Sequence, residues 1–495
     1  MDYRDLLDKP MQLQVQILRD IYAQTQGLSK RALLDKYQLS QPTLKAYLSE
    51  LTHFCAAHFP GALSLVDVDG QLKLVKATSV GLPNIIYAYL KNADAFKILA
   101  LLQQQGRFTY LELEEQLAIS SASIYRKIAD LNRVLKEFKL SIQNGQMQGS
   151  EWQIRYFYYQ LTMQLVPFEH LIDGMNDPKI LRVLADFEAG MHFSLPLAAR
   201  TKFYTWMKIT LTRYQTGQVA DFRQNANLPQ SLTGAPFYRQ FHQVLRTIGP
   251  KNDFQRTDQD IAVLYLASFC FGFLPDCADR YLEWAEGGDT VNFPFGEALH
   301  RTSSFLLKHY RMGTVLLGNF QKIRYLLIQS ILHYVLFQGF IYPYSDEQLE
   351  SEINRQASTE FVTVATSYLT KMAPLWRKSA FLPENPLYRN LTYRIQAAFR
   401  YTDFLTDQTL KVGLRFFTDL LIQELFLTLW SRKLNRDFSV QLEFFQPNTN
   451  YDLIITDYLL PTDDKARCFL ISEFDNENDI TAIRRILAGL YDQRK

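Results

Sequence analysis

The 495-residue sequence has little cysteine and no long apolar run, and both absences narrow its class. Its four cysteines are scattered, and the spacing of Cys270 and Cys277 fits neither a zinc ligand pair nor a redox CxxC motif. We therefore predict buried thiols in a reducing compartment and no metal site. The most apolar stretch, 323–342, is interrupted by polar and charged residues, whereas a spanning helix needs about 20 apolar residues. The start also lacks a signal-peptide pattern, so we expect a soluble, cytoplasmic protein with no membrane partner.

The motifs of the common enzyme classes are missing as well. The sequence contains no P-loop, no dinucleotide glycine fingerprint, no HExxH motif and no GxSxG elbow. We therefore predict no catalytic residues and no cofactor. The formal net charge of +2 conceals a mild gradient, because residues 1–160 hold 18 basic and 15 acidic side chains while residues 404–495 hold 11 and 14. This gradient permits nucleic-acid binding near the start of the chain.

An internal repeat with an offset of 80 residues is the most informative pattern present. Apolar positions of the first copy recur in the second, pairing Leu33 with Leu113, Tyr37 with Leu117, Leu39 with Ile119, Leu44 with Ile124, Leu48 with Ile128 and Leu51 with Leu131. Each copy predicts three helices. The first covers 12–24 or 94–105 and ends before a glycine, Gly27 or Gly106. Ser29 or Thr109 would cap the short second helix, and Ser40 or Ser120 the third.

Two helices joined by so tight a turn predict a helix-turn-helix, whose last helix presents its outer face to the major groove. A strand-turn-strand pattern follows each copy, with Asp69-Gly70 and Asn144-Gly145 at the turns. Both dipeptides favour two-residue hairpins, because both central positions need a positive φ. Such a hairpin is a wing. We therefore predict winged helix-turn-helix domains at 1–80 and 81–160.

The side chains expected to face double-stranded DNA are polar or basic. They are Ser40, Gln41, Thr43, Lys45 and Tyr47 in the first copy, and Ser120, Ser121, Ser123, Tyr125, Arg126, Lys127 and Arg133 in the second. Hydroxyls at a helix N-terminus can approach phosphate, and arginine or lysine can reach phosphate or guanine edges. Residues 120–139 hold five basic and two acidic residues, which favours the second copy. Winged helices also dock proteins, so a protein-docking module without DNA binding is an alternative.

The rest of the chain predicts a helical middle and an α/β end. Residues 152–405 predict almost continuous helix, and a weak repeat with an offset of 122 suggests two helical regulation domains, 161–292 and 293–405. Strands are expected at 410–416, 440–444, 451–457 and 468–472, and helices at 418–432 and 480–491. This alternation predicts a small α/β domain with a parallel sheet at 406–495. The fold class is therefore mainly α and multidomain.

The sequence LAISSASIYRKIADLNRVL at 117–135 and GSEWQIR at 149–155 resemble the Mga family of Gram-positive regulators, which includes AtxA-like proteins. The resemblance implies two DNA-binding domains, two phosphotransferase-regulation domains (PRDs) and an EIIB-like tail, in this order. It further implies a transcription regulator, usually an activator of virulence or metabolic genes. Such a regulator would respond to sugar-phosphotransfer proteins and form a homodimer through its tail.

Two departures from the family pattern concern phosphoryl transfer. The PRD pattern D-H-I-x-F-A-I-x-R, laid on 205–213, puts Trp206 at the phosphorylatable histidine, and the corresponding residue of the second bundle is Ile328. His192, His309 and His333 are the other candidates for phosphorylation. A working EIIB domain needs a nucleophilic thiolate just after its first strand, and 414–418 has no cysteine. We therefore expect a tail that binds rather than transfers; a phosphotransfer-system component is the alternative.

Overall fold

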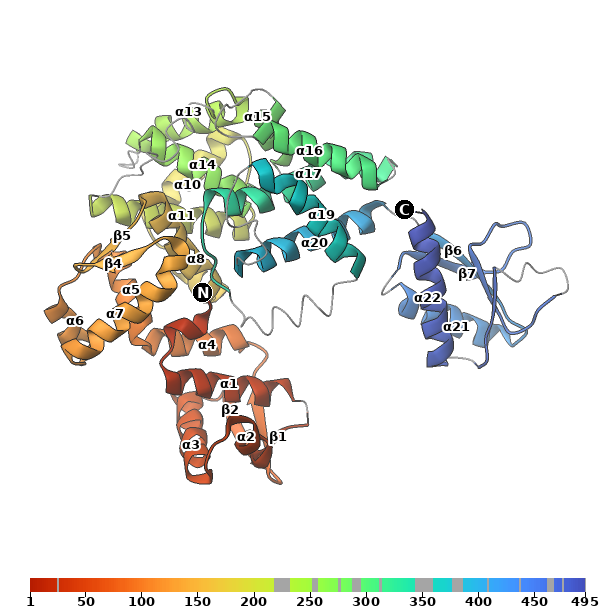
Figure 1. The fold of residues 1–495 in the computed structure, drawn as a ribbon, viewed down its shortest axis with the longest axis horizontal. Coiled ribbons are helices and arrows are strands. Elements are labelled where there is room, and N and C mark those ends of the chain that lie inside the picture. The colour runs from red at the N-terminus through yellow and green to blue at the C-terminus, as the bar shows by residue number, and fades with distance from the viewer. Residues whose placement is uncertain are drawn as a thin grey trace. The chain divides into compact units, whose positions relative to one another are not determined.

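The computed structural model describes residues 1–24, 26–217, 232–251, 257–274, 277–286, 295–310, 314–342, 359–375, 386–406, 409–435, 438–460, 467–473 and 476–494. The chain forms two compact bodies, shown among the elements of Figure 1. The first body contains 1–296, 328–359 and 373–393, and the second contains 297–327, 360–372 and 394–495. Residues of the second expected regulation domain are thus shared between the bodies. The boundary expected at 292/293 lies outside the described residues.

The first winged unit has the three helices and the hairpin that its sequence predicts, namely α1 (Lys9–Ala23), α2 (Lys30–Tyr37), α3 (Gln41–His58), β2 (Leu63–Val68) and β3 (Gln71–Lys76). It also contains η1 (Tyr3–Leu6) and the short strand β1 (Leu28–Ser29), which the sequence did not predict. The three strands form an antiparallel sheet in the order β1-β3-β2. Leu18, Leu33, Leu44 and Leu51 are at most 2% exposed, so the apolar positions of the repeat form the core.

The second winged unit repeats the three helices and the hairpin, but its sheet has two strands and an additional helix precedes the three. It contains α4 (Leu82–Asn92), α5 (Asp94–Gln105), α6 (Tyr110–Leu117), α7 (Ser121–Leu135), η2 (Lys136–Phe138), β4 (Ser141–Gln143) and β5 (Gln146–Gln148). Helix α6 begins and ends 80 residues after α2. The helices also end alike, because Gln38 and Ala118 both take the left-handed conformation, with φ of 53° and 52°. The repeat is therefore structural as well as sequential.

Both wings turn as predicted, but only the second turn is packed. The turn residues have positive φ, 52° and 75° at Asp69 and Gly70, and 49° and 70° at Asn144 and Gly145. A Cβ on Gly145 would lie 1.9 Å from the carbonyl oxygen of Phe108, whereas one on Gly70 would meet nothing within 4 Å. The Phe108 N–H also donates to the Gly145 carbonyl at 2.9 Å.

We expect Gly145→Ala to destabilise the first body far more than Gly70→Ala does. Both substitutions add the cost of a left-handed backbone, about 1–2 kcal/mol. Only Gly145→Ala also overlaps backbone, which adds about 1–3 kcal/mol as the wing shifts. Urea denaturation of the two variants measures the difference, and equal losses would contradict the packing described for the second wing.

The middle of the chain is helical, as predicted. Its elements are α8 (Glu151–Leu165), α9 (Phe168–Asp173), α10 (Pro178–Met191), α11 (Leu197–Gln215), α13 (Pro236–Lys251), α14 (Asp258–Phe271), α15 (Ala278–Glu286), α16 (Phe295–His309), α17 (Thr314–Leu336), α19 (Thr359–Met372), η4 (Ala373–Leu375) and α20 (Pro386–Thr406). Helix α8 continues from the second wing into this region, and each of its first eleven residues is buried. Among the described residues no helix is long and apolar enough to span a bilayer.

A buried network of charges joins α8 to α11 and α14. The Arg155 guanidinium donates to Asp260 at 2.6 Å and to Glu151 at 3.1 Å, and Arg213 donates to Glu151 at 2.7 Å. The four side chains are at most 6% exposed. Burial alone would raise the pKa of Asp260, but the Arg155 charge and hydrogen bonds from Arg155 and Thr257 lower it below its ordinary 3.8. The network therefore holds Asp260 ionised.

The lowered pKa of Asp260 predicts an acid-dependent loss of stability. The folded pKa lies below the unfolded one, so the stabilisation is present above about pH 4 and is lost as the pH falls through the folded pKa. We expect Asp260→Asn to be less stable than the parent at pH 6 and to lose less stability between pH 5 and pH 3. Urea midpoints across this range test the prediction. Parallel curves for the two proteins would show that Asp260 does not contribute to the acid response.

The end of the chain is an α/β domain with a parallel sheet, as predicted. Its elements are β6 (Leu410–Arg415), α21 (Leu420–Leu434), β7 (Val440–Phe444), β8 (Leu453–Thr456), β9 (Cys468–Leu470) and α22 (Glu477–Arg494), with strand order β7-β6-β8-β9. Helices α21 and α22 pack on the sheet (Figure 1) around a core that includes Leu414, Trp430, Ile455 and Ile483. Three cysteines are buried as expected, but Cys468 on β9 is partly exposed. The prediction of a buried thiol is wrong there, because β9 ends the sheet.

Candidate nucleic-acid interface

Helix α3 of the first unit exposes most of the predicted DNA-facing residues. Ser40 caps the helix, since its hydroxyl oxygen accepts from the Thr43 N–H at 3.3 Å and contacts the Thr43 hydroxyl at 2.7 Å. Gln41 and Lys45 are exposed on the following turn, and Tyr47 is half-buried. The hydroxyls, the amide and the ammonium group thus gather on the first turns of α3, where a helix can meet phosphate or base edges.

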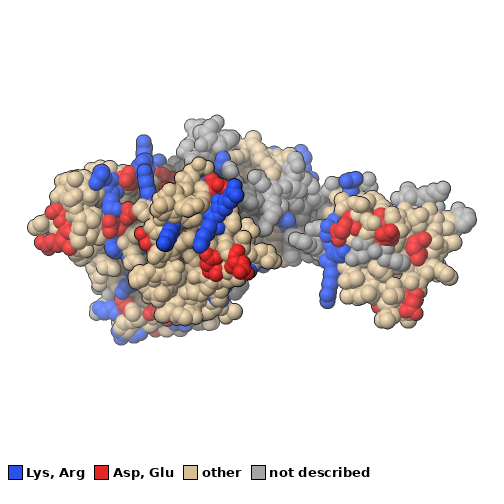
Figure 2. Space-filling view, turned by 90° about the horizontal axis from the view of Figure 1, so that it is seen from below, with Lys and Arg blue, Asp and Glu red and all other residues tan. Residues whose placement is uncertain are grey.

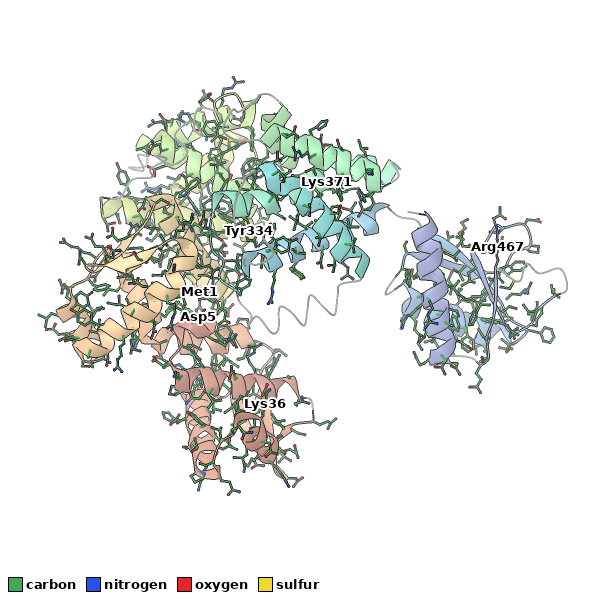
Figure 3. All side chains as sticks on the ribbon, viewed as in Figure 1. Met1, Asp5, Lys36, Tyr334, Lys371 and Arg467 are labelled. Carbon is green, nitrogen blue, oxygen red and sulfur yellow. The ribbon has the colours of Figure 1, made fainter. Side chains whose placement is uncertain are left out.

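Helix α2 is held against α1 by a second set of contacts. Lys36, labelled in Figure 3, pairs with Asp20 of α1 at 2.6 Å, and the Tyr37 hydroxyl donates to the same carboxylate at 2.7 Å. Lys30 and Arg31 are exposed at the start of α2. The sequence pattern did not predict a role for these two cations, although both directly follow the expected cap Ser29.

Helix α7 of the second unit presents a different surface. Ser120 caps it as predicted, and its hydroxyl contacts that of Ser123 at 3.1 Å. The Arg126 guanidinium, on the exposed side, donates to Ser123 at 3.2 Å. Tyr125 is 58% exposed and stacks on Tyr110 of α6 with ring centroids 4.7 Å apart. Hydroxyls, one arginine and an aromatic pair therefore lie together on this face.

Three of the residues predicted to face DNA in the second unit contact acidic side chains instead. Lys127 pairs with Asp8 at 2.7 Å and with Asp94 at 3.1 Å, and its side chain is 18% exposed. Burial opposes its charge, but hydrogen bonds to both carboxylates raise the pKa of Lys127. Lys127 thus bridges α7 to the starts of α1 and α5, and a contact with DNA would require it to leave these carboxylates. Arg133 pairs with Asp130, and the Ser121 hydroxyl donates to Glu114.

The balance of charge between the units also differs from the expectation. Helices α2 and α3, from 30 to 58, hold four basic and two acidic residues, whereas α6 and α7, from 110 to 135, hold three basic and four acidic. The glutamates of α6 cause the difference, and a count over α7 alone misses them. Figure 2 shows basic and acidic side chains interspersed on the face that it presents, rather than one continuous basic surface.

The three candidate histidines lie in unlike surroundings. His192 is exposed at the end of α10, with a left-handed φ of 59°. His309 is half-buried on α16, where its ring stacks on Phe305 and its Nδ1 lies 2.9 Å from the Phe305 carbonyl oxygen. His333 is 1% exposed and its Nε2 lies 2.8 Å from the Tyr156 hydroxyl. A phosphoryl donor cannot reach His333 in this structure. The described residues hold no cluster of three His, Cys, Asp or Glu side chains suited to a metal.

Comparison with known proteins agrees with this geometry. Residues 79–162, which include α4 to α7, the second wing and most of α8, match the family described as "Mga helix-turn-helix domain". Over 233 residues the chain is 26% identical to a protein of Streptococcus pneumoniae serotype 4 named "Putative trans-acting regulator", and the alignment covers 46% of each chain. The chain thus spans about half the length of the relative that it matches. The match at residues 79–162 confirms the resemblance of the chain to the Mga family.

Proposed function

We propose that this chain is a DNA-binding transcription regulator of the cytoplasm, acting without catalysis as an activator of virulence or carbohydrate-linked genes. The observation that carries the proposal is the pair of winged helix-turn-helix units whose third helices, α3 and α7, are capped by serine and expose polar side chains. The Mga match at 79–162 and the name of the pneumococcal relative support it. The charge balance favours the first unit for phosphate contacts, and the second unit adds Arg126 and Tyr125.

Two experiments together test the proposal. Chromosome-wide mapping first identifies DNA fragments that the protein binds, and gel-shift titration of the full chain with these fragments then measures affinity at several salt concentrations. Affinity that falls steeply with salt indicates released counterions and therefore phosphate contacts. Binding that is absent or insensitive to salt would favour a protein-docking module instead.

We also propose that the helical regulation domains respond to phosphotransfer proteins without using the usual PRD histidine position. That position holds Trp206, which is 1% exposed and packs on Tyr159, with centroids 5.4 Å apart. Arg213, the arginine of the pattern, binds the Glu151 carboxylate. His192 and His309 are the sites that we propose for phosphorylation. Incubation with phosphoenolpyruvate and the general phosphotransfer proteins, followed by mapping of the label, tests this proposal. Label on the tail would instead support the phosphotransfer-component alternative.

We propose that the tail domain mediates homodimerisation through the start of α21. Phe417, Leu420, Leu421 and Leu425 are 89%, 67%, 75% and 50% exposed, and such a cluster of large apolar side chains marks an interaction surface. The likeness to an EIIB domain and the role in dimerisation both come from the family resemblance.

Replacing Leu420 and Leu421 with aspartate is expected to convert a dimer into a monomer in sedimentation velocity. The change places charge in the proposed apolar contact without disturbing a buried side chain. Leu111→Asp is the matched control, because Leu111 is 64% exposed on α6, outside this domain. A double variant that still dimerises, or a truncation after Asp403 that does so, would rule out this interface.

A further inference from the structure

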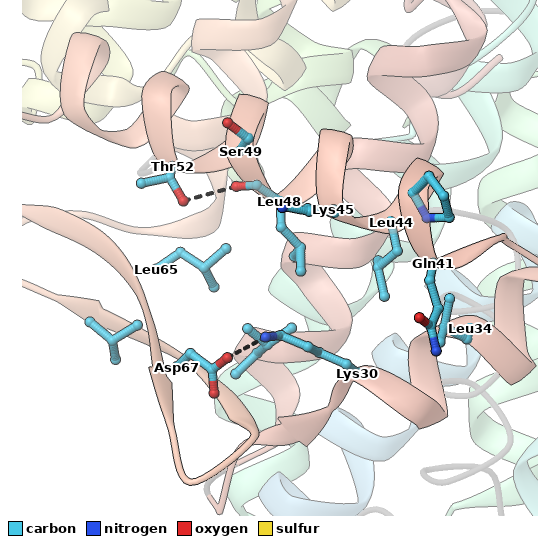
Figure 4. Close-up of a pocket in the computed structure, with 13 residues that line it drawn as sticks. Lys30, Leu34, Gln41, Leu44, Lys45, Leu48, Ser49, Thr52, Leu65 and Asp67 are labelled. Atoms are coloured by element: carbon cyan, nitrogen blue, oxygen red, sulfur yellow. Dashed lines mark hydrogen bonds and ion pairs between the residues drawn. The ribbon is translucent and has the colours of Figure 1, made fainter.

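A groove opens in the first winged unit between α3 and the wing, and its volume is about 910 Å³. Figure 4 shows the groove with α3 and α2 on one side and the strand of the wing on the other. Its floor is apolar and consists of leucines from all three elements, namely Leu34, Leu44, Leu48, Leu65 and Leu72. Leu44 and Leu72 are nearly fully buried, while Leu34, Leu48 and Leu65 remain partly exposed.

In the second winged unit, side chain–backbone hydrogen bonds join the recognition helix to the wing. There the Asn132 side chain of α7 makes two hydrogen bonds to Ile142 of β4, donating to its carbonyl at 3.0 Å and accepting from its N–H at 2.6 Å. The residue 80 positions earlier is Thr52, which lines the groove. Its hydroxyl donates to the Leu48 carbonyl of its own helix at 2.8 Å, as Figure 4 shows. The first unit therefore lacks the side chain that fastens recognition helix to wing in the second.

Two lysines, Lys30 and Lys45, lie at the rim of this leucine-lined groove. Lys30 pairs across it with Asp67 of the wing, and both side chains remain substantially exposed. Lys45 is exposed, and no ion pair joins it to another described residue. The lining thus combines an apolar floor with Lys45 and the Lys30–Asp67 pair at the edge, and its volume falls in the range of about 300–1,000 Å³ that is typical of small-molecule pockets.

We propose that this groove binds a small amphipathic organic anion, with its apolar body on the leucines and its carboxylate at Lys45. A phosphate backbone gains little from a leucine floor, whereas an apolar chain removes that floor from water. Gln41 and Lys45 also line the groove and belong to the proposed DNA surface. Bound anion and DNA therefore weaken each other's affinity, as reciprocal linkage requires. This coupling rests on the proposed function, while the binding site itself does not.

Calorimetric titration of the full chain with decanoate tests the site. We expect saturable binding near one equivalent. Binding should weaken about tenfold in Lys45→Gln, which loses a charge-assisted contact. It should weaken at least as much in Thr52→Asn, because asparagine there can fasten α3 to β2 as Asn132 fastens α7 to β4. His53→Asn is the matched control, since His53 is the next residue of α3, exposed and outside the groove, and should bind decanoate like the parent.

Three results would overturn the proposal. One is the absence of saturable decanoate binding, and another is equal affinity of the parent and a folded Thr52→Asn variant. The third is equal binding of decyltrimethylammonium, which would show that Lys45 does not select an anion. Gel shifts with the same proteins separate this inference from the proposed function. Intact DNA binding without decanoate binding overturns only the ligand site, whereas decanoate binding without DNA binding overturns only the regulator proposal and the coupling.

Discussion

Arg155→Ala is expected to cost the first body about 3–5 kcal/mol of stability, seen as a drop in Tm of roughly 10 °C. Arg155 is fully buried and contacts the carboxylates of Glu151 and Asp260. Removing its guanidinium leaves Asp260 without a cationic partner in a dry site and leaves Glu151 with Arg213 alone. A buried charge without compensation costs far more than the ion pair itself contributes.

Circular dichroism melting of the full chain measures this loss. Arg133→Ala is the matched control, because Arg133 also pairs with an aspartate but its side chain is 73% exposed. Exposed pairs contribute about 0–1 kcal/mol, so the control should melt close to the parent. If both variants melted at the same temperature, the four charges would not act as a buried network.

The double variant Lys45→Ala/Arg126→Ala is expected to bind DNA roughly 100-fold more weakly at fixed salt, because a good base or phosphate contact contributes about 1–3 kcal/mol. Each residue is the exposed cation nearest the start of its recognition helix. The slope of log affinity against log salt should also fall by about 2, one for each lost phosphate contact. Gel shifts of the parent, the two single variants and the double variant measure both quantities.

Lys127→Ala provides the contrasting case on the same helix. Its charge is already neutralised by Asp8 and Asp94, so we expect the salt slope to stay unchanged. Melting should instead show a loss of stability, because two carboxylates lose their partner. A slope that fell with Lys127→Ala would mean that the lysine leaves both aspartates to contact DNA.

The features that the sequence predicted correctly are set by neighbouring residues. Serine caps such as Ser40 and Ser120 depend on a backbone N–H three residues away, and the wing turns depend on two adjacent residues with positive φ. The repeat strengthened these predictions by showing each pattern twice. The strands and helices of the tail were recognisable for the same reason, since each is a short run with its own periodicity.

The features that the sequence could not give depend on residues far apart in the chain. Lys127 looks like a DNA contact on its helix, and only the fold places Asp8, 119 positions away, beside it. The charge around the second recognition helix also depends on the fold, because α6 brings Glu112, Glu114 and Glu115 to the same unit as the basic residues of α7. The groove at Thr52 could not be predicted either, because it depends on a side chain–backbone hydrogen bond between helix and wing that Asn132 makes in the second unit and Thr52 does not make in the first.

The complete burial of the first eleven residues of α8 limits where the chain can be divided into fragments that fold. A gene fragment that stops near residue 160 would encode a last helix whose aromatic side chains have lost every neighbour contributed by α11, and we expect such a product to aggregate. Recombination would meet the same obstacle. Joining residues 1–160 to a different helical region would require new side chains on both α8 and the helix that replaces α11. We therefore expect the winged units and the helical region to evolve together.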